Sequence, residues 1–544
     1  MLDFNRNLGM PYFHNGEGLK LNDMLKKGIY RTILITTILV LVLLVALQLV
    51  AKAIMTNFLD RNIPSHIQLE YSGSRVNVFT GTVGLDGVNM EWSDPDTTGV
   101  HSILKMEALN LEGFGYLDFL FRNTLSLEQL AMVKPKMKYM PYRHFSQKDT
   151  LKAKGSGIKR ELAIARFIIV EGEFTQLQEG PDSIKFQVDK LDVSIRDLKT
   201  NGVTIKNKIP FSYGDYAFGT GKVLVDLGPF EIMEFNSMDI SEGDMLLKEL
   251  TLTSKHSRRE LSKILEHERD YIDLKIPRIG LSGLDFGSDG NRFFLNIASG
   301  ILNAPVLEMY RDKLIADDLK KKKLYGQMLR ELPFDLDIAV LDIQKGYIAY
   351  AELVAEGTDP GGIFFSDIDT GLKTISNTDR GEGGTKIEIR AKLMGEAPLL
   401  LNWNFDPAKE NDAFLISGSV ANFRAESINP FLKSNLRAEA EGEVKELYFT
   451  IHGDALSAKG DMKMHYGDFT FKVLQKDRKG VNKLLTAIGN IFVNDGSKTD
   501  GKGYRYGEIY AERDDTKSFF NYLWLNVRAG ILSTLTGDGK KKNV

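Results

Sequence analysis

The residues that could do chemistry are few and scattered along the chain. The eight histidines show neither H-E-x-x-H spacing nor an i, i+4 pair beside a carboxylate, which a helical zinc site requires. The acidic stretch 285–291 lacks the calcium-loop pattern, and GTGK at 219–222 lacks phosphate-loop spacing and is interpreted as a hairpin turn. No G-x-S-x-G motif and no cysteine occur. The sequence therefore predicts no catalytic residue, no metal site, no cofactor and no enzyme.

The composition is that of a folded protein without a basic surface. Apolar residues make up 43% of the 544 positions and charged residues 26%, which excludes wholesale disorder. A formal charge of −3 gives no reason to expect a nucleic-acid partner, whose phosphates need clustered cations. The absence of cysteine removes disulfides and leaves the redox compartment open.

An uncharged apolar segment near the N-terminus predicts a membrane anchor. Residues 32–51 read TILITTILVLVLLVALQLVA, long enough for a hydrocarbon core of roughly 30 Å. The alternative is a cleaved signal peptide, because Ala51-Lys52-Ala53 resembles a cleavage site. The long apolar core and long leader favour an uncleaved transmembrane helix over 28–53, after a cytosolic segment 1–27.

The flanking charges predict the orientation of this anchor. More basic residues precede it than follow it, and cytosolic flanks carry the excess of Lys and Arg. Those before it are Arg6, Lys20, Lys26, Lys27 and Arg31, against Lys52 and Arg61 after it. We therefore expect a cytosolic N-terminus and the bulk of the chain on the other side of the membrane.

One short pattern recurs without gaps at 127–139, 164–176 and 338–350. Each copy has apolar residues at the first, fourth, sixth and eleventh places. The ninth place is Pro135, Gly172 or Gly346, residue types that make turns. The pattern predicts a repeated β-hairpin, and the step of three followed by two indicates alternation interrupted once, as at a bulge.

Much of the remaining chain alternates apolar and polar residues, which predicts sheet with one wet face. Segments 184–195, 386–393 and 468–474 are examples, and helical spacing is confined to 257–270, 306–331, 478–493 and a stretch from about 515. The expected fold class is mainly β with a few helices: an elongated, curved antiparallel sheet after the transmembrane helix. The expected regions are 54–255 (β-rich repeats), 256–331 (mixed connector), 332–475 (second β region) and 476–544 (helical end).

The C-terminal stretch predicts an amphipathic helix. Its apolar stripe has steps of four, and two further aromatic residues widen it. The stripe consists of Phe519, Leu523, Val527, Ile531 and Leu535, widened by Phe520 and Trp524. Arg528, Asn521 and Asn526 argue against a spanning helix. Two alternatives stay open: a helix lying in a membrane interface, or a cap on the open end of the sheet.

Three stretches resemble the AsmA-like family of Gram-negative envelope proteins, part of a group of bridge-like lipid-transfer proteins. Residues 103–139 resemble the N-terminal repeat, with a leucine-rich connection and a strand pair closing on Pro or Gly. Residues 332–353 and 414–474 resemble later parts, with turn residues such as Gly418, Gly442 and Gly460. The resemblance covers most of 30–536 and includes no catalytic signature.

The resemblance implies a single-pass inner-membrane protein with its bulk in the periplasm. It also implies that the apolar face of the sheet forms a groove that binds or conducts phospholipid. Because the chain is shorter than the large members of the group, a second envelope protein is expected to complete a bridge. The expected groove residues are Leu130, Met132, Leu341, Ile343, Ile348, Phe469, Phe471 and Val473.

Two other functions stay open from the sequence. The first is a non-transporting binding or assembly factor in outer-membrane protein biogenesis. The second is a scaffold within a larger envelope machine. Both are compatible with packed β-sandwiches, in which a second sheet rather than acyl chains covers the apolar face.

Overall fold

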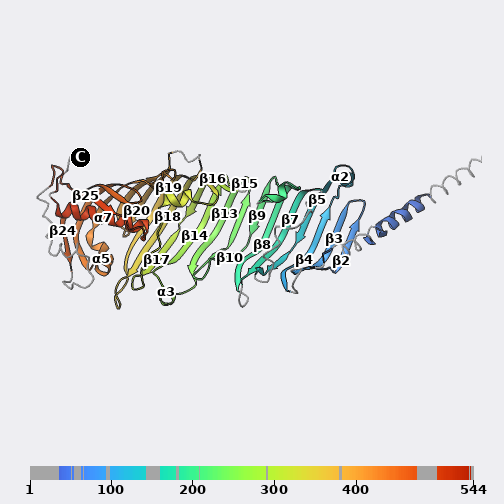
Figure 1. Cartoon of the computed structure of the whole chain (residues 1–544), viewed down its shortest axis with the longest axis horizontal. Helices are drawn as coiled ribbons and strands as arrows, with labels where there is room; N and C mark the ends of the chain where they lie inside the picture. Colours follow the sequence, from blue (N-terminus) through green and yellow to red (C-terminus); the bar gives the residue numbers. More distant parts are fainter. Residues whose placement is uncertain are drawn as a thin grey trace, which may run out of the picture.

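The computed structural model describes residues 36–50, 52–53, 63–64, 66–93, 99–141, 160–178, 183–207, 209–289, 292–378, 383–473, 499–537 and 539–540. Within these ranges the protein is mainly β, and 25 strands form one sheet. Figure 1 shows the strands side by side along the long axis, with a helix at the C-terminal end. The prediction of a mainly β fold with a C-terminal helix is confirmed.

The strands of the N-terminal half include several short ones beside two of seventeen residues. They are β1 (Ile67–Glu70), β2 (Gly73–Asn77), β3 (Thr82–Ser93), β4 (Val100–Glu112), β5 (Thr124–Val133), β6 (Lys136–Tyr139), β7 (Glu161–Leu177), β8 (Ile184–Thr200), β9 (Tyr216–Thr220), β10 (Val223–Asp226), β11 (Glu231–Phe235), β12 (Ser237–Ser241) and β13 (Asp244–Ser254).

The later strands are mostly longer. They are β14 (Asp270–Ser282), β15 (Asp285–Asp289), β16 (Arg292–Asn303), β17 (Val306–Asp312), β18 (Asp335–Leu353), β19 (Gly361–Ser376), β20 (Thr385–Leu393), β21 (Ala397–Phe405), β22 (Phe414–Arg424), β23 (Ala438–Gly453), β24 (Ser457–Val473) and β25 (Arg505–Glu512). The sheet continues across the expected region boundaries at 255/256 and 331/332.

Helices punctuate the sheet. They are α2 (Tyr116–Phe121), the 3-10 turn η2 (Thr204–Lys206), α3 (Arg258–Ile264), α4 (Tyr325–Arg330), the 3-10 turn η4 (Ala425–Ile428), α5 (Asn429–Leu436) and α7 (Phe519–Thr536). The expected helix over 306–331 is wrong for most of its length, because β17 begins it and only α4 is helical. The expected helix over 478–493 lies outside the described residues.

The expected anchor is described only in part. Residues 36–50 and 52–53 are helical, and the rest of 28–53 lies outside the described ranges. Among the described residues, no helix has the length and apolarity needed to cross a membrane.

The sheet is mixed rather than purely antiparallel, which corrects the expected fold class. β7 pairs in parallel with β5 and with β6, and β18 pairs in parallel with β16 and with β17. The other strand pairs described are antiparallel. A parallel pair requires a crossover connection that returns the chain to the end at which the first strand began, and residues 313–334 form this connection between β17 and β18.

The repeated pattern lies within strands and does not form hairpins. Residues 338–350 fall inside β18 and residues 164–176 inside β7, while 127–139 covers β5 and β6, which continue in the same direction. Lys345, Glu171 and Lys134, at the eighth place, have φ of 55°, 50° and 48°. Pairing shifts register beside Gly172 and Gly346. The expected turn is therefore a mid-strand bulge.

Glycine is needed in this bulge because neighbouring atoms leave no room for a side chain. The positive φ belongs to the preceding residue, not to the glycine itself. A Cβ at Gly172 would lie 2.9 Å from Ile169 Cγ2 and 3.2 Å from the Leu191 carbonyl oxygen. Bulges bend strands and increase their twist, so these positions curve the sheet.

The bulges are aligned across neighbouring strands. The first copy pairs with the second in register, Leu127 with Ile164 and Met137 with Phe174. Residues 297–309 pair in the same parallel register with 338–350, for example Ile297 with Ile338. Within this segment Ala304, which precedes Pro305, has a φ of 48°. This fourth copy was missed because its fourth place is glycine. Two parallel strand pairs thus repeat one bent unit.

We predict that Gly172→Ala lowers stability, because the added methyl group overpacks the bulge at a cost of about 1–3 kcal/mol. Gly280→Ala is the matched control, since a Cβ there meets nothing within 4 Å and its φ is not positive. Circular-dichroism melting of the full chain in detergent checks this. Equal melting temperatures for the two variants would contradict the packing role of Gly172.

Candidate functional site: the apolar face of the sheet

One row of side chains crosses the sheet from β3 to β25. Directly paired residues of adjacent strands point to the same face. The row, called here the apolar row, consists of Leu85, Leu109, Met132, Ile169, Val193, Phe218, Ile240, Met245, Leu281, Gly300, Leu341, Leu372, Ile387, Trp403, Ile416, Ile451, Gly460 and Ile509.

The apolar row contains no polar side chain. At about 4.8 Å per strand its contour is roughly 80 Å. The adjacent row, on the opposite face, is rich in small and polar residues. Its members include Ser194, Ser241, Ser282, Ser299, Lys373, Lys386, Asn404, His452 and Lys459. The sheet therefore has one apolar and one wet face along its length.

Burial along the apolar row changes from one end to the other. From Leu109 to Leu372 most of the side chains are half-buried, with Val193 and Gly300 buried. From Ile387 to Ile509 all are buried except Gly460, and Ile416 and Ile451 are 0% exposed. The apolar face is thus covered at its C-terminal end and mostly half-buried from Leu109 to Leu372, while Leu85 at its N-terminal end is 5% exposed.

Aromatic residues gather where the apolar row crosses β9. The Tyr216 ring lies 5.6 Å from Phe218 and 5.3 Å from Phe286. The Tyr213 hydroxyl donates a 2.9 Å hydrogen bond to the Phe286 carbonyl oxygen. Burial, followed by the nearby Asp285 carboxylate, raises the pKa of Tyr213 above its usual value. The surroundings are therefore apolar enough to disfavour charge.

Five of the expected groove residues lie on this face. Met132 and Leu341 belong to the apolar row itself. Leu130 pairs with Phe167, Ile343 with Leu302 and Ile348 with Leu307. All five are half-buried.

The other three expected groove residues lie at the C-terminal end. Phe469 is partly buried against the cluster of buried residues at the C-terminal end of the sheet, called here the C-terminal core, which includes Ile416 and Ile451. Its ring lies 5.8 Å from Tyr466. Phe471 and Val473 pair with Ala440 and Ala438 through the backbone, and their side chains lie outside the described residues. Phe469 therefore belongs to the covered end of the sheet.

Helix α7 covers the apolar row at this end by packing on β23, β24 and β25. The Phe519 ring stacks on Trp403 at 4.6 Å and meets Phe414 edge-on at 5.4 Å. Gly507 permits the close approach, because a Cβ there would lie 2.5 Å from the Thr534 nitrogen. The structure places α7 as a cap on the sheet, which was one of the two alternatives.

The buried stripe of α7 lies beside the expected one. Tyr522, Asn526, Gly530 and Thr534 are buried together with Phe519 and Leu535. Leu523, Val527 and Ile531 are partly buried against the same core, and Trp524 packs 5.5 Å from Phe431. Phe520 is 60% exposed. The close approach favours small residues such as Gly530, which periodicity of large apolar residues does not detect.

A crossover segment, residues 313–334, adds to this cover. It joins the end of β17 to the start of its parallel neighbour β18, a strand of 19 residues or roughly 60 Å. Leu324 is 3% exposed within the C-terminal core, and the Tyr325 ring lies 5.2 Å from Trp403 and 5.7 Å from Phe519. The crossover segment therefore runs over the apolar face.

A buried carboxylate ties the crossover segment and α7 to the middle of the sheet. Glu268 is 3% exposed at its side chain, and its oxygens lie 2.7 Å from Lys313 Nζ and 3.1 Å from Lys517 Nζ. Lys517 also lies 3.0 Å from Asp317. Burial alone lowers the pKa of Lys517, but its bonds to Asp317 and Glu268 raise it above its usual value. Lys517 thus stays charged immediately before α7.

The other end of α7 is held by an arginine. Arg505 of β25 is 1% exposed and donates to the carbonyl oxygens of Thr534 at 3.0 Å and Gly537 at 2.8 Å. These carbonyls have no partner within the helix, so Arg505 satisfies them and fixes the helix end. Neither this arginine nor Glu268 is signalled by local sequence, because their partners are far away in the chain.

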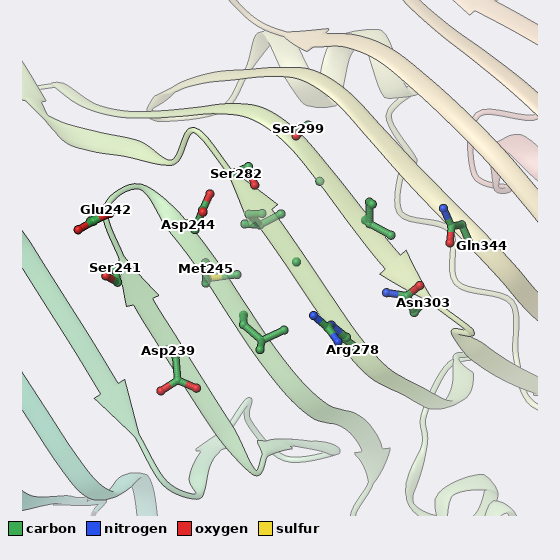
Figure 2. Close-up of a pocket in the computed structure, with 15 residues that line it drawn as sticks. Asp239, Ser241, Glu242, Asp244, Met245, Arg278, Ser282, Ser299, Asn303 and Gln344 are labelled. Carbon is green, nitrogen blue, oxygen red and sulfur yellow. The ribbon is translucent and has the colours of Figure 1, made fainter.

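A shallow hollow of about 820 Å³ lies on the opposite, wet face. Figure 2 shows its polar side chains, among them Asp239, Asp244, Arg278 and Asn303, from β12, β13, β14 and β16. No group of three or more metal-ligating side chains occurs in the part of the chain that the structure describes. Most of its lining residues belong to the wet face, and Met245, Leu281 and Gly300 of the apolar row border it from behind. We regard the apolar row as the candidate site.

The fold and this face define an extended single-layer sheet with an uninterrupted apolar surface. No family model and no curated protein matches the sequence of the chain.

We predict that Phe519→Ala destabilises the C-terminal end by about 3–5 kcal/mol, because it removes a buried ring stacked on Trp403. Phe520→Ala is the control, since that neighbouring ring is 60% exposed. Urea unfolding followed by tryptophan fluorescence measures both. An effect of Phe520→Ala as large as that of Phe519→Ala would mean that α7 is not seated as a cap.

Proposed function

We propose that this protein is an inner-membrane-anchored periplasmic protein of the AsmA-like type, which binds or conducts phospholipid along its apolar face. The observation that carries the proposal is the apolar row, which continues across the sheet without a polar interruption. The resemblance of 103–139, 332–353 and 414–474 to that family points the same way.

Acyl chains suit such a face for a simple energetic reason. Each methylene transferred from water to an apolar surface contributes about 0.8 kcal/mol, so a long apolar strip holds lipid without specific polar contacts. Half-buried side chains from Leu109 to Leu372 leave apolar area that a second sheet or a lipid would cover. Lipid is the occupant we propose.

The covered C-terminal end bears on the alternatives. α7 and the crossover segment occupy the face where lipid would leave toward a partner. A second envelope protein that completes a bridge would therefore contact this end. A non-transporting assembly factor would need no continuous apolar row, which is why we rank it second.

The decisive experiment compares two adjacent residues of β7. Ile169 belongs to the apolar row, whereas Val170 points to the opposite face and is 40% exposed. Ile169→Glu places a charge where acyl chains would lie and should strongly reduce co-purifying phospholipid. Val170→Glu should leave it unchanged, as measured by native mass spectrometry of the full chain in mild detergent.

Melting temperatures of both variants separate lipid loss from unfolding. A half-buried glutamate on an open face keeps access to water, so Ile169→Glu should melt close to the parent protein. If it unfolds the chain, the face is closed by protein, since burying an unpaired charge costs several kcal/mol. Lipid-free parent protein, or equal lipid in both variants, would rule out the proposal.

The orientation has its own test. A reporter active only in the periplasm should work when fused after residue 100 and fail when fused at residue 15, because the basic flank precedes the apolar segment. Fusion protein levels measured by immunoblot serve as the control. The reverse activities would overturn both the orientation and the compartment.

A further inference from the structure

An exposed apolar patch lies at the N-terminal end of the sheet, away from the apolar row. Helix α2 presents Leu117, Leu120 and Phe121 at 71%, 68% and 78% exposure. Tyr116, the first residue of α2, is 46% exposed, and Phe79, in the turn between β2 and β3, is 58% exposed. So many large apolar side chains gathered at one place mark an interaction surface.

Contacts join this patch to the helical segment 36–50. Gln48 donates to the Val76 carbonyl oxygen and accepts from the Val78 nitrogen at 3.2 Å. The Tyr116 hydroxyl donates to the Val78 carbonyl oxygen at 2.7 Å. The segment 36–50 and α2 therefore hold the same turn, and both lie at the same end of the molecule in Figure 1.

The helical segment is itself apolar and exposed. Ile38, Leu43 and Leu49 are 51%, 68% and 64% exposed, so its surroundings in the membrane would be hydrocarbon. The α2 patch continues this surface at the end of the segment that reaches the sheet. A surface continuous with a membrane helix meets the same bilayer.

The residues around the patch have the chemistry of a membrane interface. Tyr116 combines a ring with a hydroxyl, as interfacial aromatic residues do. Arg122, 78% exposed at its side chain, pairs with Asp118 at 2.9 Å, and Arg160 lies 3.9 Å from the Phe119 ring. Cations beside apolar side chains suit phosphate headgroups above acyl chains.

We infer that the α2 patch inserts into the leaflet of the bilayer that holds the helical segment 36–50, so that the N-terminal end of the sheet rests on the membrane. The inference rests on the anchoring in the proposed function. Each Leu or Phe that enters hydrocarbon strengthens the association by about tenfold or more. The insertion would hold the N-terminal end of the sheet at the membrane surface.

The lack of native cysteine makes the test direct. Single variants Leu117→Cys and Phe121→Cys of the full chain are labelled with an environment-sensitive fluorophore. The protein is then reconstituted into nanodiscs of phosphatidylcholine and phosphatidylglycerol, with or without nitroxide-labelled lipid. Leu43→Cys reports the anchor, and Leu456→Cys, 78% exposed between β23 and β24, is the control away from the membrane.

We expect quenching by nitroxide lipid at positions 43, 117 and 121, and none at 456. Quenching at 43 without quenching at 117 and 121 overturns the insertion and leaves the anchor intact. If no position is quenched, the segment 36–50 is not a membrane anchor, and the membrane part of the proposed function is wrong. A blue shift at 117 and 121 without quenching would show that a second copy covers the patch, which also overturns the inference.

Discussion

The apolar face of a single sheet has to be covered from water, and the rest of the structure depends on this requirement. In a sandwich the cover is a second sheet. Here, α7 and the crossover segment cover only the C-terminal end, where Ile416 and Ile451 lose all exposure. Over most of its length the apolar row stays half-buried. The protein therefore keeps a long apolar surface that its own side chains leave half-buried.

Bulges, which bend strands, follow one another across neighbouring strands. Lys134 and Glu171 adopt positive φ side by side in β5–β6 and β7, and Ala304 and Lys345 do so in β16–β17 and β18. Because the parallel pairs are in register, each bend continues the bend of its neighbour. The parallel pairing that breaks the expected antiparallel pattern also produces the crossover segment. One topological feature thus supplies both the bend and part of the cover.

The sequence predicted the class of fold, the wet and apolar faces, the C-terminal helix and the positions of the irregularities. It misassigned the irregularities as turns, because glycine after a residue with positive φ fits a turn or a bulge equally well. Only the partner strand decides between them, as the pairing of Gly346 with Ile368 shows. The contacts of Glu268 with Lys313 and Lys517 had no local signal, since they join residues far apart in the chain. The register that aligns the apolar row from strand to strand had no local signal either, although the sequence indicated two of its members, Met132 and Leu341.

The two ends of the apolar row differ in what an arriving acyl chain would meet. At the N-terminal end Leu85 is 5% exposed, the members of the row that follow it are mostly half-buried, and Gln48 of the helical segment 36–50 bonds to Val76 and Val78. At the C-terminal end an acyl chain would compete with Phe519 and Leu523 for the same apolar neighbours, an exchange of similar surfaces with little net change in apolar burial. Lys517 and Arg505 also hold α7 by polar contacts, which an acyl chain cannot make. Under the proposed function, the contacts of Lys517 and Arg505, rather than hydrophobic contact, determine whether α7 stays on the sheet. While α7 stays there, lipid does not replace it at the C-terminal end of the face.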